Sequence, residues 1–242
     1  MNTITTQMQE LSDVGAHFGY PRARRHPTAA PFLFGTKDRV DIFDLAKTAP
    51  MLEKAEAFVR ELAASGKTLL FVGGKNEVVA VLKGEAERVG QPYVAGRWIG
   101  GTLTNFKNIR QRIARMEKLI ADRESGELEK KYTKKEQLLL QREVDNLDFR
   151  FGGITQMSDL PAALFVVDSR HEHTAVKEAK QLKIPVIALS SSDCDFGPVT
   201  HAIPGNDTSM KSTKFVITAI ANAYAEGRRG AAAKVETPPA KI

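Results

Sequence analysis

Short apolar runs alternate along the chain with segments whose apolar residues recur at every third or fourth position. The runs predict strands buried on both faces of a sheet, because a half-exposed strand would show a polar residue at every second position. These strands are expected at residues 68–72, 164–167 and 185–189, with shorter ones at 93–95 and, at a sheet edge, 201–203.

The segments between these runs predict amphipathic helices. Apolar residues recur at helical spacing within residues 78–89, 173–182 and 209–225. In a further helix, Thr48 is a candidate N-cap with Pro50 in the first turn, and Gly66 ends the helix. Alternating strands and helices predict an α/β fold, in which a parallel sheet carries helices on both faces and is joined by right-handed crossovers.

Residues 105–151 interrupt this alternation with two long, charged segments that show no strand signal. Thr133 and Glu136 have the spacing of a capping box that opens the second segment. Two narrow apolar stripes that face each other predict an antiparallel helical hairpin. The stripes consist of Phe106, Ile109, Ile113, Met116 and Ile120 in the first segment and Leu140, Val144, Leu147 and Phe151 in the second.

Residues 1–35 combine weak helical signals at residues 6–14 with an arginine-rich, proline-rich stretch that predicts a loop rather than a strand. We expect Phe32 and Phe34 to point inward and the arginines to point outward. The stretch is interpreted as a structural arm that also contacts RNA, with guanidinium groups on phosphates and aromatic rings on bases.

The segment from Arg97 to Phe106 joins the alternating strand and helix segments to the long charged segments. It carries the single tryptophan, Trp98. Its glycine pair permits a sharp turn, and Thr104 or Asn105 can cap the helix that follows. Two interpretations are equally open: an elbow with a buried tryptophan, or a binding surface. Within either, we favour Trp98 as a brace between the hairpin and the core, rather than a base-stacking ring.

Composition narrows the class of protein. The net charge of +6 favours a polyanionic partner, the apolar runs are too short to cross a bilayer, and Met1–Glu10 lacks the features of a secretory signal. Cys194 is the single cysteine, so a cytoplasmic location is expected.

Basic residues with few nearby acids form three patches, a distribution that suits a folded nucleic acid. The patches are Arg22, Arg24 and Arg25, then Lys107, Arg110, Arg112, Arg115 and Lys118, and finally Arg228 and Arg229.

Two enzyme classes are disfavoured by the loop that follows residues 68–72. Gly73-Gly74-Lys75 has the wrong glycine spacing for a phosphate-binding P-loop, and Asn76 stands where a magnesium-binding Ser or Thr is needed. The loop also lacks the G-x-G-x-x-G pattern of a dinucleotide site.

A cluster at the carboxyl ends of the later strands keeps one enzyme hypothesis open. Open α/β sheets bind ligands at this edge, and Asp, His and Cys are metal ligands. The alternative function is therefore a metal-dependent enzyme that uses Asp168, His171, His173 and Cys194, although no pair has a diagnostic metal spacing. Asp193, Asp195 and His201 lie nearby in the sequence. A third possibility is an adaptor whose hairpin binds protein, which salt-insensitive binding would favour.

Taken in order, these motifs resemble the universal small-subunit ribosomal protein family S-two over nearly the whole chain. The resemblance is carried by residues 15–19 (GAHFG), 34–35 (FG), 42–45 (IFDL), 47–48 (KT), 71–73 (FVG), 97–106 (RWIGGTLTNF), 166–168 (VVD), 184–189 (IPVIAL) and 203–207 (IPGND). The chain departs from the common bacterial pattern at residues 20–23, 26–30, 169–173 and 190–198, which leaves the His and Cys cluster without a family explanation.

The resemblance implies a flavodoxin-like α/β fold with an inserted coiled-coil hairpin, in a protein that binds 16S ribosomal RNA and neighbouring small-subunit proteins. It also implies a role in docking the OB-repeat ribosomal protein that captures messenger RNA, with no catalysis, cofactor, membrane or small-molecule substrate. The RNA-facing positions would be His17, Arg22, Arg24 and Arg25 on the arm, Arg97, Trp98, Thr104, Asn105, Lys107 and Arg110 at the elbow, and Asn206, Lys211 and Lys214 near the last helix.

We therefore predict four parts of the chain. Residues 1–40 form the arm, 41–104 and 152–226 the α/β core, 105–151 the coiled-coil hairpin, and 227–242 a flexible tail with few bulky apolar residues.

Overall fold

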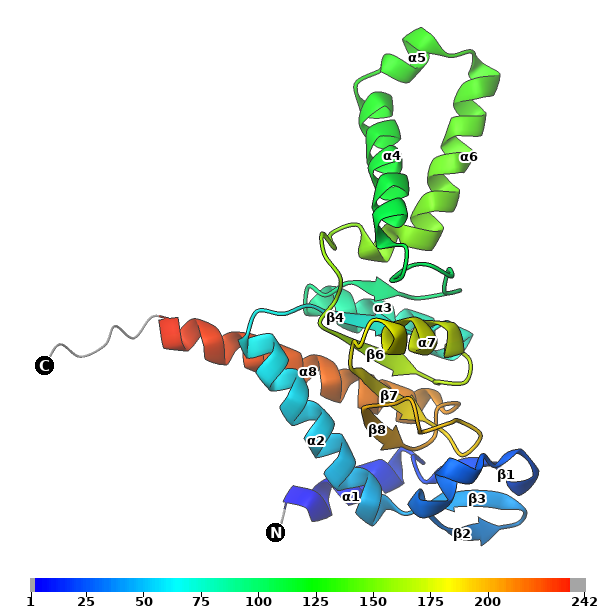
Figure 1. Ribbon diagram of the computed structural model, residues 1–242, viewed down its shortest axis with the longest axis vertical. Coiled ribbons are helices and arrows are strands. Elements are labelled where there is room, and N and C mark those ends of the chain that lie inside the picture. Colours follow the sequence, from blue (N-terminus) through cyan, green and yellow to red (C-terminus); the bar gives the residue numbers. More distant parts are fainter. Residues whose placement is uncertain (1–2, 236–242) are drawn as a thin grey trace, which may run out of the picture.

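A five-stranded parallel sheet forms the centre of the computed structural model, which describes residues 3–235 (Figure 1). The order β5-β4-β6-β7-β8 places the first strand of this sheet between the second and the third, as in flavodoxin-like folds. The predicted parallel α/β architecture is confirmed. The strands are β4 (Leu69–Val72), β5 (Tyr93–Val94), β6 (Ala163–Val167), β7 (Val186–Ser190) and β8 (His201–Pro204), with β8 at an edge as expected.

Both faces of the sheet are buried, which explains the uninterrupted apolar runs. Alternate strand residues point to opposite faces, so Phe71 and Phe165 enter one apolar cluster while Leu70 and Leu164 enter another. Helices α2 (Leu45–Ala64), α3 (Asn76–Arg88) and α8 (Met210–Val235) cover the first face together with α1 (Thr3–Asp13). The second face is covered by α7 (His173–Gln181) and by Trp98 and Leu103 of the elbow.

Helix α2 begins earlier than the sequence predicted. Its N-cap is Asp44, whose carboxylate accepts a hydrogen bond from the Ala46 amide at 3.1 Å, and Pro50 lies inside the helix. The predicted N-cap, Thr48, is instead buried and donates to the Pro204 carbonyl at 2.9 Å. The end of the helix is as predicted, since Gly66 follows it with a φ of 69°.

Helix α8 continues to Val235, so the prediction of a flexible tail from residue 227 was wrong for residues 227–235. A β-carbon at Gly227 would lie 2.3 Å from the Arg60 carbonyl oxygen of α2. The glycine therefore permits close packing of α8 on α2 rather than ending the helix. Residues 236–242 lie outside the described residues. Within the described part of the chain, no helix is long and apolar enough to cross a membrane.

The amino-terminal stretch forms a small sheet, so the prediction of a loop was wrong. Strand β3 (Val40–Phe43) pairs antiparallel with both β1 (Phe18–Pro21) and β2 (Leu33–Lys37), and two 3-10 helices, Arg22–Arg24 and Pro27–Phe32, connect β1 to β2. Phe32 packs against Phe196 as an inward residue, with ring centroids 4.9 Å apart. Phe34 is 81% exposed, contrary to expectation.

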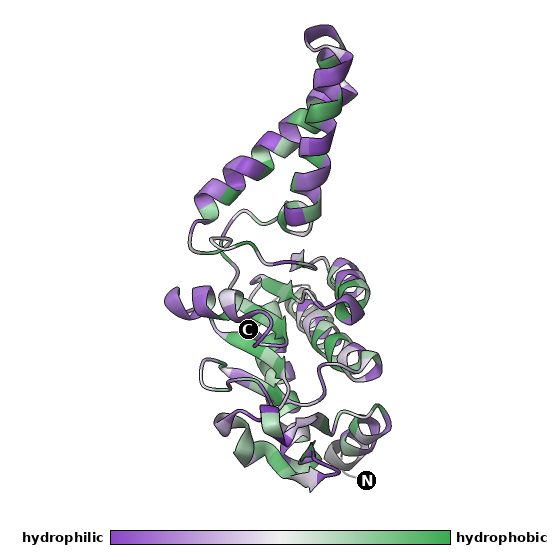
Figure 2. Ribbon diagram, turned by 90° about the vertical axis from the view of Figure 1, so that its right-hand side faces the viewer, coloured by the Kyte–Doolittle hydropathy of each residue, from purple (hydrophilic) through white to green (hydrophobic). Residues whose placement is uncertain are grey.

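Residues 106–151 form two helices that lie side by side and project from one end of the sheet (Figure 1). They are α4 (Phe106–Glu124) and α6 (Lys134–Phe151), joined by the short α5 (Glu127–Lys131). Figure 2 shows this pair as mainly hydrophilic and the central strands as hydrophobic. The Thr133 amide donates to the Glu136 carboxylate at 2.9 Å, as the capping box predicts. The coiled-coil character of the pair stays a prediction.

Candidate functional site

The elbow between the sheet and the projecting helices is fixed by one buried carboxylate, that of Glu178 on α7. Its Oε1 accepts hydrogen bonds from the indole Nε1 of Trp98 at 3.1 Å and from the Gly101 amide at 2.8 Å. Its Oε2 accepts from the amides of Leu103 and Thr104, both at 3.0 Å, and from the Thr104 hydroxyl at 3.1 Å. One side chain therefore satisfies five donors of the elbow.

These donors stabilise the ionised form of Glu178. Burial alone would raise the pKa of this carboxyl, but hydrogen bonds from Thr104, Trp98, Gly101 and Leu103 hold the pKa below its ordinary value. Because Ala175 and Ala179 on the same helix are buried in the core, the carboxylate is held in place relative to the sheet. The elbow is consequently a fixed turn.

Trp98 is 7% exposed and packs in the core, so the prediction of a brace is confirmed and Trp98 does not belong to the accessible surface. Gly101 has a φ of 89°, which only glycine adopts at little cost. Asn105 occupies the N-cap position of α4, but its side chain makes no capping hydrogen bond. The Thr104 hydroxyl contacts Glu178 instead, so the side-chain cap predicted for Thr104 or Asn105 was wrong.

The remaining elbow residues predicted to face RNA are exposed, with one exception. Arg97, Thr104, Asn105 and Lys107 are exposed around the fixed turn. Arg110 is half-buried, and its Nη1 donates to the Thr155 carbonyl at 2.7 Å, which ties α4 to the segment after α6. A cavity of about 800 Å³ separates the elbow from the base of α6 and is lined in part by Arg97 and Phe149.

On the arm, the three predicted arginines divide into two kinds. Arg22 and Arg24 are exposed, and the Arg24 guanidinium lies 5.6 Å from the ring centroid of Tyr20. Arg25 contacts both carboxylate oxygens of the buried Asp41, with Nε 2.7 Å from Oδ2. Arg25 therefore holds the small sheet together, while Arg22 and Arg24 remain on the surface.

Two other residues that were predicted to contact RNA, Asn206 and His17, make contacts within the protein. The side-chain oxygen Oδ1 of Asn206 accepts hydrogen bonds from the amides of Thr208 and Ser209, and its Nδ2 donates to the Gly15 carbonyl at 3.1 Å. Its side chain thus joins the start of α8 to the arm and is 9% exposed. His17 is half-buried and packs on Phe18, with ring centroids 4.1 Å apart.

Lys211 and Lys214 are exposed on α8 and line a groove between α1, α2 and α8. The predicted contact residues are therefore distributed over three separate surfaces, at the elbow, on the arm and on α8. The structure does not bring them into one site.

The switch point of the sheet, where flavodoxin-like folds bind ligands, is filled by this chain's own residues. The Lys75 ammonium after β4 lies 2.7 Å from a carboxylate oxygen of Asp168 after β6 and 3.1 Å from one of Asp207 after β8. A β-carbon on the adjacent Gly74 would lie 2.5 Å from the Gly96 carbonyl oxygen. The two loops therefore touch, and an ion cluster occupies this edge of the sheet.

Burial and mutual charge interactions together shift the pKa of each group in this cluster. Burial and repulsion by Asp168 raise the pKa of Asp207 to about 7, against the opposing effect of Lys75. Burial would raise the pKa of Asp168 as well, but its contact with Lys75 holds that pKa below the ordinary value. The same two carboxylates raise the pKa of Lys75, although burial alone would lower it. Lys75 thus stays an ammonium ion between two acids.

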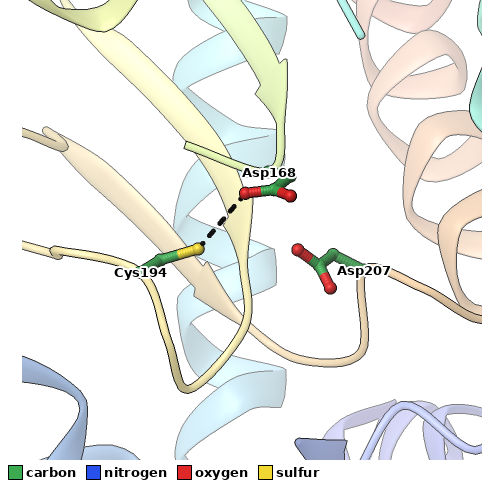
Figure 3. Close-up of side chains that lie close together, drawn as sticks. All are labelled: Asp168, Cys194 and Asp207. Atoms are coloured by element: carbon green, nitrogen blue, oxygen red, sulfur yellow. Dashed lines mark hydrogen bonds between the residues drawn. The ribbon is translucent and has the colours of Figure 1, made fainter. Parts of the chain in front are cut away.

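Cys194 lies beside this cluster, with its Sγ 3.5 Å from Asp168 Oδ1, and its side chain points toward Asp168 and Asp207 (Figure 3). Burial and the neighbouring carboxylates raise the pKa of the thiol to about 12. A thiol with this pKa is protonated at neutral pH and is a poor nucleophile and a poor metal ligand.

The metal site predicted from Asp168, His171, His173 and Cys194 is not assembled. Ligand atoms of Asp168, Cys194 and Asp207 do lie within 4.8 Å of one another, but they share their surroundings with the Lys75 ammonium. Both histidines are exposed outside this group, and His171 Nδ1 contacts Glu172 at 2.7 Å. Sequence reasoning missed Lys75 and Asp207 as partners, although each follows a predicted strand end as Asp168 does.

Comparison with the sequences of known proteins identifies the family of this chain. The family model for ribosomal protein S2 matches residues 11–227. The small ribosomal subunit protein uS2 of Coprothermobacter proteolyticus is 43% identical over 223 residues, which cover 92% of this chain and 83% of that protein. The protein of the same name from Corynebacterium urealyticum is 42% identical over 225 residues, covering 93% and 84%. The chain therefore belongs to the ribosomal protein S2 family.

Proposed function

We propose that this protein is a structural component of the small ribosomal subunit, where it binds 16S ribosomal RNA and neighbouring ribosomal proteins. The names of the two relatives described above support the assignment to the small subunit. One structural observation carries the RNA-binding part of the proposal. Exposed cations, Arg97 and Lys107, flank a turn whose backbone is locked by Glu178.

The elbow suits RNA because its exposed groups can bind phosphates without being reorganised. Arg97 and Lys107 supply positive charge, while the side chains of Thr104 and Asn105 lie between them as hydrogen-bonding groups. Since neither the turn nor α7 has to move, little conformational entropy is lost on binding. On the arm, Arg22, Arg24 and His17 form a second proposed contact surface, and Lys211 and Lys214 form a third one on α8.

We assign α4 and α6 to a coiled-coil projection that contacts protein partners. Leu138, Leu139 and Phe149 on α6 are exposed apolar side chains, with exposed fractions of 53%, 54% and 79%. Such residues are common at protein interfaces. In this proposal the OB-repeat ribosomal protein that captures messenger RNA is one of the proteins that docks with the help of this chain.

The buried ion cluster has a structural role in this proposal. Lys75, Asp168 and Asp207 join the carboxyl ends of three strands, and no exposed nucleophile accompanies them within the described residues. The protein thus works by binding, in the cytoplasm, as part of the ribosome. The metal-dependent enzyme considered from the sequence gains no support from the separated histidines.

Sedimentation tests the proposed function. A tagged chain expressed in its own organism should be recovered with the small subunit after sucrose-gradient centrifugation, and it should stay there when messenger RNA is removed by nuclease. Recovery of all tagged protein at the top of the gradient would contradict the proposal. Metal analysis of untagged, purified protein provides a second check, since one equivalent of tightly bound metal would favour the enzyme alternative.

A further inference from the structure

A groove of about 880 Å³ lies between the arm and α7, and the lysines of its α7 wall, Lys177 and Lys180, were not among the contact residues predicted from the sequence. One wall carries Arg24 and His26, and the other carries His173, Lys177 and Lys180. We propose that this groove holds a segment of the RNA backbone, with the two lysines on successive phosphates. The inference rests on the proposed function and extends it to a new contact surface.

The α7 wall is both charged and fixed in position. Lys177 and Lys180 are exposed, whereas Val176 and Ala179 between and beside them are buried in the core. Glu178, on the buried side of the same helix, binds the elbow. The lysines therefore project from a helix that is held on its other side. No acidic side chain lies within 4.0 Å of either ammonium group among residues 3–235, which leaves both charges available.

The arm wall is held in place by its own contacts. The pairing of Arg25 with Asp41 fixes the short helix that carries Arg24. Arg24 lies over the Tyr20 ring and has no acidic partner within ion-pairing distance in the described structure. Residues far apart in the sequence thus place uncompensated cations on both sides of one groove.

Two acidic residues line the groove, and one of them pairs with an arginine of the groove. Arg170 Nη1 lies 2.7 Å from a carboxylate oxygen of Asp193, and His26 Nδ1 lies 3.9 Å from one of Asp195. Counting Arg170 against Asp193 and treating the histidines as neutral leaves Arg24, Lys177 and Lys180 facing a single acid, Asp195. The groove therefore attracts a polyanion rather than a cation.

RNA fits these features better than an acidic peptide. Val176 and Pro198 are the apolar residues of the lining, and Val176 is buried. A docked peptide normally anchors itself through large apolar side chains in apolar pockets, whereas this groove is lined mainly by charged and polar residues. A nucleic acid strand instead presents a charge at every nucleotide, matching cations along both walls.

Site-directed crosslinking tests the inference directly. Cys194 is buried, so a cysteine introduced at an exposed position can be modified selectively with an azidophenacyl photocrosslinker. We would place it at Lys177 (Lys177→Cys) and, as a matched control outside the groove, at the exposed Lys54 on α2 (Lys54→Cys). Each labelled full-length chain is rebound to small subunits that have been salt-washed free of the protein, and then irradiated.

We expect the Lys177→Cys probe to crosslink to 16S ribosomal RNA and the control to give no more RNA product than an unlabelled chain. Crosslinking to a ribosomal protein alone would overturn the inference in favour of a protein ligand, and absence of any product in bound chains would overturn it outright. The unmodified chain distinguishes the two proposals, because its failure to rebind would contradict the proposed function itself.

A second variant tests whether the positive charges of Lys177 and Lys180 bind RNA phosphates. Lys177→Gln/Lys180→Gln removes two cations without altering the buried side of α7. If both bind phosphates of a single strand, the slope of log affinity against log salt should become shallower by about 1.4, at about 0.7 for each contact. An unchanged slope with unchanged affinity would contradict the role of the lysines.

Discussion

The indole Nε1 of Trp98 donates a hydrogen bond to the carboxylate of Glu178 at 3.1 Å, and both side chains are buried. This contact joins the segment that leaves the sheet to a helix that follows the projecting pair in the sequence. The same carboxylate holds the Gly101, Leu103 and Thr104 amides. The orientation of the elbow therefore depends on one acidic residue of α7.

Substitution of that residue should destabilise the protein. In Glu178→Gln the side-chain amide places an N–H₂ group against backbone donors, and the charge that strengthens the remaining bonds is lost. We expect the free energy of unfolding to fall by about 2–3 kcal/mol in urea denaturation. The exposed Glu53→Gln on α2 is the matched control and should change it by less than about 0.5 kcal/mol. Equal effects of the two variants would refute the role of Glu178.

The pH dependence of the same variant provides a separate test. The pKa of Glu178 is lowered in the folded protein, so its stabilising contribution is fully present above the unfolded value of about 4.3. That contribution is lost as the pH falls through the lower, folded value. The stability difference between wild type and Glu178→Gln should therefore be constant from pH 6 to pH 5, on the order of 2–3 kcal/mol, and narrow below about pH 4. A gap that widens in acid would contradict this assignment.

Lys75 should be needed to keep two carboxylates buried. Lys75→Met removes the cation from between Asp168 and Asp207, and we expect a loss of about 3–5 kcal/mol in unfolding free energy. Adding Asp207→Asn to this variant should restore part of the loss, because one of the uncompensated charges is gone. The control Lys83→Met, in an exposed pair with Glu87, should cost less than about 1 kcal/mol. If the two substitutions changed the unfolding free energy additively, the proposed interaction between Lys75 and Asp207 would be contradicted.

Asp207 should make the protein less stable as the pH rises. Its pKa of about 7 in the folded state exceeds the unfolded value, so the folded form binds the proton more tightly. The corresponding stabilisation is present below about pH 4 and is lost as the pH rises towards and through 7. Denaturation from pH 5 to pH 8 should show this decline in the wild type and not in Asp207→Asn. Parallel pH profiles of the two proteins would contradict it.

Substitution of the arm arginines should have different effects, on stability for Arg25 and on RNA binding for Arg22. Arg25→Ala leaves the buried Asp41 without its cation and should reduce unfolding free energy by about 2 kcal/mol, since the Arg25 side chain is 25% exposed. Arg22→Ala should change stability by less than about 0.5 kcal/mol but lower the salt slope of RNA binding by about 1. Denaturation and filter binding with 16S ribosomal RNA measure the two effects. The reverse pattern would exclude the proposed division of roles.

Much of the central fold could be predicted because the hydrophobic pattern of each strand or helix depends on which of its faces is buried. Residues 69–72 are apolar throughout because Leu70 and Phe71 face two different cores, and that pattern is unambiguous in the sequence. The amino-terminal sheet could not be predicted in this way. Its strand β1 contains a glycine and a proline, and it is held by distant groups, such as the Ser192 hydroxyl that accepts a hydrogen bond from the Tyr20 amide at 2.9 Å.

The site was only partly predictable for a related reason. The elbow was identified from its glycines and Trp98, but its buried partner Glu178 looks in the sequence like any charged residue of an amphipathic helix. Lys75 and Asp207 are likewise far apart in the sequence, with most of the core elements between them. The end of α8 was misjudged because the stretch from residue 227 has few bulky apolar residues, whereas Gly227 lets the helix continue in close contact with Arg60. In each case the deciding contact is long-range.

Subunit occupancy of an elbow variant tests the central claim most directly. Arg97→Glu/Lys107→Glu reverses both exposed charges that flank the turn, and the exposed pair Lys54→Glu/Lys67→Glu makes the same change in net charge elsewhere. Sucrose gradients would compare the fraction of each tagged chain that sediments with small subunits, after circular dichroism has verified folding. We predict a large loss for the elbow variant and wild-type occupancy for the control. A folded elbow variant with undiminished occupancy would contradict RNA binding at the elbow.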